Sequence, residues 1–176
     1  MTVLLVFESM FGNSEKVARA IAAGLATHVD VVVREAGTST AQCVPGDIDL
    51  LVVGGPTHAF SMTRATTRED AIRQGARSGL PDRGLREWLE DLPADVEHLS
   101  AATFDTRVSK VRKLPGSAAR SAARMLRRKG ARLVTKPESF FVEDVSGPLA
   151  EGELARAEAW GESLATLLQS EAVRST

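Results

Sequence analysis

The first 25 residues constrain the fold of this chain more than any other stretch. Residues 3–7 form an apolar run without charge, and a short break follows at residues 8–14. Apolar residues then recur at helical spacing, at Val17, Ala18, Ile21, Ala22 and Leu25. Strand, tight turn and helix in this order are typical of an open α/β sheet. The turn lies where the first helical N–H groups lack partners and the helix dipole is positive, which is a place that binds phosphate well.

The turn does not match either of the two better-known nucleotide loops. It lacks the three glycines of a dinucleotide fingerprint and the Gly-Lys-Ser/Thr of a P-loop. Two interpretations stay open on this stretch alone. The loop binds a phosphate through amides and hydroxyls without a lysine, or it is an ordinary turn in which Asn13 or Ser14 caps the helix.

Length and composition predict one domain without covalent or metal cross-links. The chain has 176 residues and a single cysteine, Cys43, which excludes an internal disulfide and any cysteine-based metal site. Three histidines, His28, His58 and His98, show no ligand spacing, so we expect no metal. The first apolar run is too short for a signal peptide, and no run is long enough to span a bilayer. We therefore expect a cytoplasmic protein.

Further strands and helices alternate along the chain. Strands are predicted at 29–34, 48–53 and 98–104, and a fifth strand over 132–135 and 139–143 is interrupted near Pro137. Helices are predicted near 68–74 and at 85–92, 117–129 and 151–168. In the last helix the core spacing falls on Leu154, Ala157, Trp160, Leu164, Leu167 and Leu168. This alternation predicts a doubly wound, five-stranded parallel sheet with helices on both faces.

The carboxyl ends of parallel strands meet at one edge of a sheet, where ligands bind. The segments that follow strands one, three and four are 9–14, 54–62 and 104–107, and each is unusual for a plain connection. We expect these three segments to converge on one ligand site.

The pieces VFESMFGNSEKVA, VVGGPTHAF and TFDTR, each beginning in a predicted strand, resemble the flavodoxin family, and the resemblance extends over nearly the whole chain. It implies a single flavodoxin-like domain over 1–176, strand order 2-1-3-4-5, and FMN as cofactor. It implies a phosphate loop made of Ser9, Met10, Phe11, Gly12, Asn13 and Ser14. One side of the flavin ring would be lined by Pro56, Thr57, His58, Ala59 and Phe60, and the other by Thr103, Phe104, Asp105, Thr106 and Arg107.

Flavodoxins commonly stack Trp and Tyr on the flavin, but this chain has no Tyr and both Trp residues fall in predicted helices. We therefore expect Phe60, Met62 or Phe104 to stack on the ring. The extra length of this chain falls at about 63–84, an insertion after strand three that could cover the flavin as a lid.

Two charged or titratable residues of these segments have alternative roles. For His58 we favour contact of the main chain, rather than the ring, with the ligand. Arg107 either pairs with Asp105 or approaches the edge of the flavin.

Charge is distributed unevenly along the chain. Residues 107–136 hold eleven Lys and Arg and no acid, which leaves eleven Lys and Arg against 23 Asp and Glu in the remainder. This block is either the solvated face of a helix or a docking face for an acidic redox partner protein. No recognition motif for nucleic acid is present. We expect a monomer or weak homodimer.

The sequence therefore favours a flavodoxin-like electron carrier in which FMN does the redox chemistry and no protein side chain acts as a nucleophile. An alternative is an FMN-dependent NAD(P)H reductase of the same fold that acts on a quinone or similar acceptor. A flavin-free binding scaffold is the third. A receiver domain is disfavoured because strand one ends in Phe7, Glu8 and Ser9 without paired Asp residues.

Overall fold

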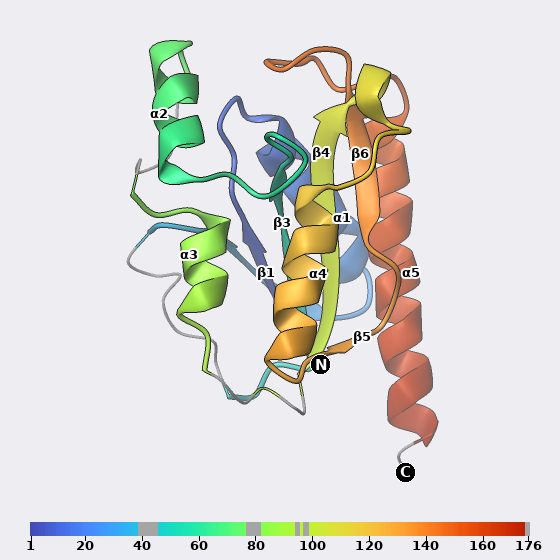
Figure 1. Ribbon diagram of the computed structural model, residues 1–176. Coiled ribbons are helices and arrows are strands. Elements are labelled where there is room, and N and C mark those ends of the chain that lie inside the picture. Colours follow the sequence, from blue (N-terminus) through green and yellow to red (C-terminus); the bar gives the residue numbers. More distant parts are fainter. Residues whose placement is uncertain (39–45, 77–81, 94–95, 97–98, 175–176) are drawn as a thin grey trace.

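Six parallel strands form the central layer of the computed structural model, which describes residues 1–38, 46–76, 82–93, 96 and 99–174 (Figure 1). The strands are β1 (Thr2–Phe7), β2 (Asp30–Glu35), β3 (Leu50–Pro56), β4 (Ser100–Val108), β5 (Arg132–Leu133) and β6 (Glu138–Val142). The helices are α1 (Asn13–Ala26), α2 (Ala65–Arg73), α3 (Leu85–Glu90), α4 (Ala118–Arg128) and α5 (Glu153–Arg174), with a 3₁₀ turn η2 (Ser109–Val111).

The strand order is β2-β1-β3-β4-β5, and β6 also pairs with β4. This confirms the predicted order and the predicted break in the fifth strand. β5 and β6 are successive pieces that both pair with β4, through Ala101–Leu133 and Phe104–Glu138 respectively. Pro137 lies between them, and proline has no N–H to donate to a ladder.

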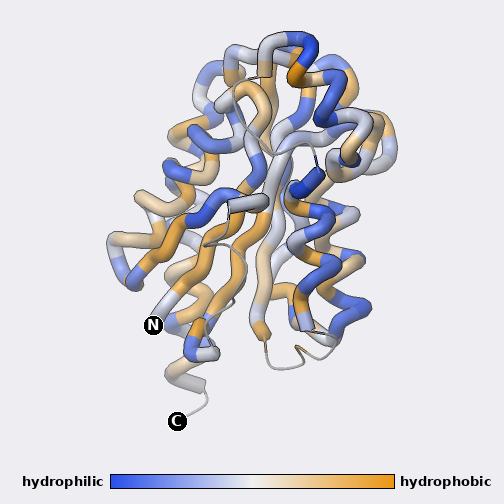
Figure 2. Tube along the Cα trace, turned by 90° about the vertical axis from the view of Figure 1, so that its left-hand side faces the viewer, coloured by the Kyte–Doolittle hydropathy of each residue, from blue (hydrophilic) through white to orange (hydrophobic). Residues whose placement is uncertain are grey.

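Each face of the sheet is covered by a pair of helices. Val3, Leu5 and Phe7 belong to the core cluster shared with α1 and α5, whereas Leu4 and Val6 belong to the cluster shared with α3 and α4. Figure 2 shows the apolar strands between these helical layers. Because both faces are buried, β1 is apolar at every one of these positions rather than alternating.

The backbones of helices α1 and α5 are in direct contact where the two helices cross. An ideal Cβ on Gly24 would lie 2.0 Å from the carbonyl oxygen of Glu158, and one on Gly161 would lie 2.2 Å from that of Ile21. Any side chain at either glycine would push the helices apart. This close crossing fixes α1, and with it the loop at its N-terminus, against the sheet.

The third and fourth strands extend beyond their predicted ends. Their pairing continues through Gly55–Asp105 and Pro56–Thr106, and β6 supports the other side of β4 as far as Val108. The predicted loop at 104–107 is therefore wrong, because these residues are in β4. Cys43 and His98 lie outside the described residues.

In α5 two of the predicted core positions are wrong. Leu154 and Leu167 are 44% and 40% exposed, while Ala165, which was not predicted, is buried. The covered stripe of α5 faces α1 at the glycine crossing and the sheet at Phe104 and Phe140, and Leu154 and Leu167 lie outside it. Among the described helices, none has the length and apolar character needed to cross a membrane.

Candidate functional site

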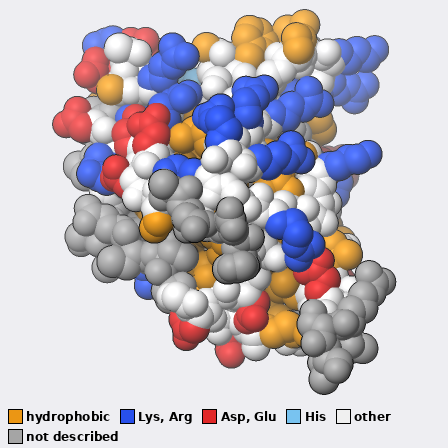
Figure 3. Space-filling model, turned by 60° about the horizontal axis from the view of Figure 1, so that its bottom comes forward, with side chains coloured by type: hydrophobic (Ala, Val, Ile, Leu, Met, Phe, Trp, Pro, Cys, Tyr) orange, Lys and Arg blue, Asp and Glu red, His pale blue; other side chains and the backbone are white. Residues whose placement is uncertain are grey.

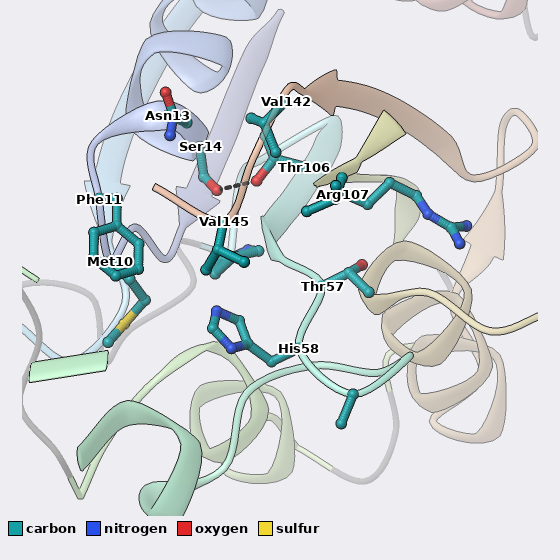
Figure 4. A pocket seen from close by; sticks show the side chains of 13 residues that line it. Met10, Phe11, Asn13, Ser14, Thr57, His58, Thr106, Arg107, Val142 and Val145 are labelled. Carbon is teal, nitrogen blue, oxygen red and sulfur yellow. Dashed lines mark hydrogen bonds between the residues drawn. The ribbon is translucent and has the colours of Figure 1, made fainter. Parts of the chain in front are cut away.

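A cavity of about 180 Å³ opens at the carboxyl ends of β1, β3, β4 and β6 (Figure 4). Strands β1 and β3 are neighbours whose connections leave in opposite directions, which is where open α/β sheets bind ligands. The cavity is lined by Met10, Phe11, Asn13, Ser14, Pro56, Thr57, His58, Ala59, Thr106, Arg107, Val108, Val142 and Val145. Ten of these thirteen lie in the three segments expected to converge.

The loop after β1 presents free backbone donors to this cavity. Gly12, with φ +83°, precedes the helix as its N-cap, and no side chain caps it, so the predicted capping by Asn13 or Ser14 is wrong. The next amides are used, since Glu15 N donates to Ser9 Oγ at 3.3 Å and Lys16 N to the Gly12 carbonyl at 3.1 Å. Within the described structure, the amides of Gly12, Asn13 and Ser14 donate to no protein group. These three donors face an anion-binding position.

A pair of hydroxyls joins this loop to β4. Ser14 Oγ and Thr106 Oγ1 lie 2.7 Å apart, and both residues are buried. Two hydroxyls have two hydrogens, and their mutual bond uses one of them. The pair therefore keeps one hydrogen for a ligand in the cavity.

A fourth segment, residues 143–149 after β6, closes over the same loop. Asn13 Nδ2 donates to the carbonyl of Ser146 at 3.1 Å, and an ideal Cβ on Gly147 would lie 2.7 Å from Asn13 Nδ2. Val142 and Val145 line the cavity, and neither was predicted from the sequence. The signal was available, because the fifth strand of a parallel sheet ends at the same edge as the others.

The loop after β3 contains a tight two-residue turn. His58 N donates to Ser61 O at 2.9 Å and Ser61 N to His58 O at 3.0 Å, around Ala59 and Phe60 with φ 45° and 62°. Positive φ is unfavourable for non-glycine residues, by roughly 1–2 kcal/mol each. The surrounding contacts hold this turn, and Phe60 stands 48% exposed at the rim without lining the cavity.

The His58 ring lies in the wall of the cavity, near Met10, Phe11 and Val145 (Figure 4). Burial lowers the pKa of His58 below its ordinary value of 6.5. The imidazole is therefore neutral at neutral pH. A neutral imidazole can donate a hydrogen bond to a ligand through one nitrogen or accept one through the other, but it adds no charge to the site.

Only the end of the predicted TFDTR segment reaches the cavity. Thr106 and Arg107 line it, whereas Thr103 and Asp105 are buried inside β4 away from it. Phe104 is fully buried behind Gly54 and packs edge-on to Phe140 and Trp160, with ring centroids 6.3 and 6.4 Å away. Its side chain belongs to the core between the sheet and α5.

Of the two charged residues of this segment, Asp105 binds the start of α4 and Arg107 binds the connection that precedes it. Asp105 Oδ2 accepts a hydrogen bond from Ala119 N at the start of α4, at 2.9 Å. The Arg107 guanidinium donates to the carbonyls of Val111 and Leu114 at 2.7 and 3.2 Å, and it points away from Ser14 and His58 (Figure 4). Of the two roles expected for Arg107, pairing with Asp105 is wrong, since no such ion pair forms among the described residues.

None of the three residues expected to stack on a flavin lines the cavity. Phe104 and Met62 are buried in the two cores, and Phe60 points outward at the rim. Phe11 is the aromatic residue that does line it. Phe104 is turned toward α5 because β4 continues past it, whereas Phe60 remains exposed at the rim, so which side chain stacks on a flavin stays a prediction.

A buried polar network lies directly behind the loop and was missed by the sequence analysis. Thr63 Oγ1 donates to Glu8 Oε1 at 2.5 Å, and Leu85 N donates to Glu8 Oε2 at 2.8 Å. Arg68, from α2, is 1% exposed, donates to Thr63 Oγ1 at 2.9 Å and forms an ion pair with Glu87 at 3.0 Å. This network fastens α2, which stands beside the layered body in Figure 1.

The two carboxyl groups of the network shift in opposite directions. Burial raises the pKa of Glu8, although hydrogen bonds from Thr63 and Leu85 act against it. Burial would also raise the pKa of Glu87, but hydrogen bonds from Arg68 and Gly84 outweigh it and lower that pKa. A lone Arg within a polar stretch gives no signal of such burial in a sequence.

A second cavity, of about 300 Å³, lies between α2 and the loop after β3. It is lined by His58, Ala59, Thr67, Asp70, Ala71, Gln74 and Val145, of which His58, Ala59 and Val145 also line the first. Two small molecules could therefore bind on either side of the same wall. Among the described residues, no group of three or more His, Cys, Asp or Glu is placed to hold a metal ion.

The sequence and the structure were compared with those of known proteins. No protein-family model and no curated protein matches the sequence. Among solved structures, flavodoxin 2 from Bacillus cereus is similar at a TM-score of 0.67 and 18% identity, over 97% of this chain and 99% of that one. A flavodoxin from Streptococcus pneumoniae TIGR4 has a TM-score of 0.61 and 20% identity, over 94% and 99%. A diflavin flavoprotein A3 from Nostoc sp. has a TM-score of 0.61 and 16% identity, over 100% and 98%. The chain has the flavodoxin-like fold.

Proposed function

We propose that this chain is a cytoplasmic FMN-binding protein that transfers electrons. The observation that carries the proposal is the set of amides of Gly12, Asn13 and Ser14, which donate to no described protein group at the positive end of α1, where Asn13 and Ser14 line the cavity. Several solved proteins of this fold are flavodoxins by name, which raises the expectation of a flavin.

The residues present fit the phosphate of FMN. Three amides and the spare hydrogen of the Ser14–Thr106 pair supply donors, and α1 supplies partial positive charge. An ideal Cβ on Gly12 would have no atom within 4 Å, so there is open space in front of the backbone. No lysine is required, because charge-assisted bonds from amides to an anion are strong.

The ring of FMN would lie between the loops, against Phe11, His58 and Val145, with one edge at the rim. Bound FMN would supply the redox chemistry by accepting and returning electrons. The protein would orient the ring through the turn at Ala59 and Phe60, which two hydrogen bonds between His58 and Ser61 close, and would exclude water with its apolar wall. His58 would add a neutral hydrogen-bonding group, and no side chain would act as a nucleophile.

Titration of the purified, flavin-free protein with FMN and with riboflavin tests the proposal. Flavin fluorescence and the visible spectrum report binding, and riboflavin lacks only the phosphate. We expect FMN to bind at least about tenfold more tightly, since hydrogen bonds to a charged group contribute about 1.5–3 kcal/mol each. Equal affinity for both ligands would exclude the phosphate site, and no binding of either would leave the fold as a flavin-free scaffold.

One observation favours a second candidate, an FMN-dependent NAD(P)H reductase acting on a quinone or similar acceptor. The cavity against α2 shares His58, Ala59 and Val145 with the proposed FMN site and offers room for a second small molecule. The α2 helix lies in the predicted insertion, about 63–84, and its anchoring by Arg68 would keep this wall in place.

Steady consumption of NADH or NADPH by the FMN-loaded protein, with a quinone added, distinguishes the two candidates. If the reductase is right, Gln74→Trp should fill the second cavity and raise KM several-fold, while Gln74→Ala should not. FMN affinity should be the same in both variants. Absence of turnover with both nucleotides would leave the electron carrier.

A further inference from the structure

The exposed face of α4 carries four arginines. Arg120, Arg124, Arg127 and Arg128 are exposed, and their spacing places them on one side of the helix. Elsewhere in the described chain arginines are commonly paired, as in Arg132 with Glu171. No ion pair joins the four α4 arginines to any described residue.

Three more cations, Lys110, Arg112 and Lys113, are exposed on the segment between β4 and α4. This segment begins directly after Val108, which lines the first cavity. The basic face, defined here as these three residues and the four α4 arginines, therefore extends from the mouth of the cavity along α4. Figure 3 shows Lys and Arg side chains gathered in a broad band.

The basic face is fixed to the rim of the cavity by several contacts. Ala118 N donates to Thr57 Oγ1 at 2.8 Å, and the hydroxyls of Ser61 and Ser121 lie 3.1 Å apart. An ideal Cβ on Gly116 would lie 2.7 Å from the carbonyl oxygen of Phe60. The cations are therefore held at a defined place relative to the proposed FMN site.

Apolar side chains are exposed where the basic face meets the rim. Phe60 is 48% exposed and Leu114 is 45% exposed, and they belong to two segments that touch at Gly116. An apolar centre with a charged surround is the usual anatomy of a protein interface. Charges at the periphery steer encounter and set orientation more than they add affinity.

We infer that the basic face, with Phe60 and Leu114, docks an acidic redox protein whose electron-carrying centre lies within a negatively charged surface. The inference rests on the proposed function, because the partner would exchange electrons with FMN at the same rim. One electron would leave the reduced centre of the partner and enter the FMN of this chain. No other reactant is required.

A plant-type [2Fe–2S] ferredoxin, which is an acidic protein, is a suitable probe, and cytochrome c is a basic counterpart. We would measure the affinity of each for the flavin-free and the FMN-loaded chain by calorimetry, at low salt and at about 0.2 M salt. We expect the ferredoxin to bind both forms and to be released by salt, and cytochrome c not to bind. Stopped-flow reduction of the loaded chain by reduced ferredoxin should show the same dependence on salt.

Charge reversal locates the surface. Arg124→Glu should weaken ferredoxin binding on the order of three- to tenfold. Lys16→Glu, an equal change on exposed Lys16 of α1 in the opposite helical layer, should change it less than twofold. Neither variant should unfold, since both side chains are exposed.

Equal effects of the two reversals, or tighter binding of cytochrome c, would overturn the inference. Tighter binding of a short DNA duplex than of ferredoxin at 0.2 M salt would overturn it as well and would indicate nucleic acid. The affinity of ferredoxin for the flavin-free chain is measured without any cofactor. Failure of FMN binding and failure of docking therefore give different results.

Discussion

Removal of the Ser14 hydroxyl tests the proposed phosphate site most directly. Ser14→Ala leaves the amide donors of the loop in place but removes one member of the Ser14–Thr106 pair. A hydrogen bond to a charged group contributes about 1.5–3 kcal/mol, and 1.4 kcal/mol is a factor of ten in affinity. We therefore expect FMN to bind about 10- to 150-fold more weakly.

Riboflavin provides the internal reference for this experiment. It lacks the phosphate, so its affinity should change less than about twofold in Ser14→Ala. Fluorescence titration of both flavins with wild type and variant gives four constants, and their ratio isolates the interaction of Ser14 with phosphate. A loss shared equally by both ligands would indicate general damage to the cavity.

The variant also leaves Thr106 Oγ1 without its partner in a buried position. This should cost about 1–3 kcal/mol of folding stability, which thermal denaturation would show. Ser163→Ala is the matched control, because Ser163 is an exposed helical serine on α5 whose hydroxyl donates to Ala159 O at 2.9 Å. Unchanged FMN affinity in Ser14→Ala, with the control also unchanged, would refute a hydrogen bond from the Ser14 hydroxyl to the phosphate.

Three further predictions concern stability. Gly24→Ala should lower the free energy of unfolding by about 1–3 kcal/mol or more, because its Cβ would lie 2.0 Å from a carbonyl oxygen and overpacking outweighs the gain in helix propensity. The control Ala23→Gly, on the exposed side of α1, should lose only about 1 kcal/mol. A urea titration that showed Gly24→Ala to be more stable than wild type would contradict the close crossing of α1 and α5. The raised pKa of Glu8 means that the folded state keeps its proton to higher pH than the unfolded state, so this residue's contribution to stability is full below pH 4.5 and is lost as pH rises. The free energy of unfolding of wild type relative to Glu8→Gln should fall as pH rises from 4 to 8, by at most about 1.4 kcal/mol per pH unit. A rise over the same range would contradict the burial of Glu8. His58 has the opposite effect on the pH dependence of stability, because its lowered pKa makes the unfolded state bind a proton at higher pH than the folded state. The free energy of unfolding should therefore fall as pH drops below 6.5, and His58→Gln should remove that fall. Identical pH profiles of wild type and variant would show that the ring is not buried.

The sequence predicts the frame of this molecule well because the frame depends on local pattern. The apolar run of β1, the turn and the apolar face of α1 require no knowledge of distant residues. The break in the fifth strand follows from Pro137 alone. Strand order followed from resemblance rather than from pattern, and the structure confirms it.

The details of the site were harder to predict because they depend on partners far away in the sequence. The polar residues Asp105, Thr106 and Arg107 resemble a loop, yet β6 pairs with all three and β3 pairs with Asp105 and Thr106, which makes them a strand. Arg68 is buried because Glu87 and Thr63 meet it there, and a single sequence does not show such a meeting.

Asp105 illustrates a physical reason why site residues are easily misassigned in this fold. In a parallel sheet the carboxyl end of each strand faces the ligand site, and the N-terminus of the following helix starts near the same edge. Ligands and helix N-termini both require hydrogen-bonding groups there, so one polar residue type suits either purpose. In this chain Asp105 and Thr57 accept hydrogen bonds from the first amides of α4, whereas Thr106 pairs with the loop of α1. The polar residues at this edge thus have two roles: some fix the helix that carries the basic face, and others form the wall of the cavity. This division connects the proposed docking face to the proposed FMN site.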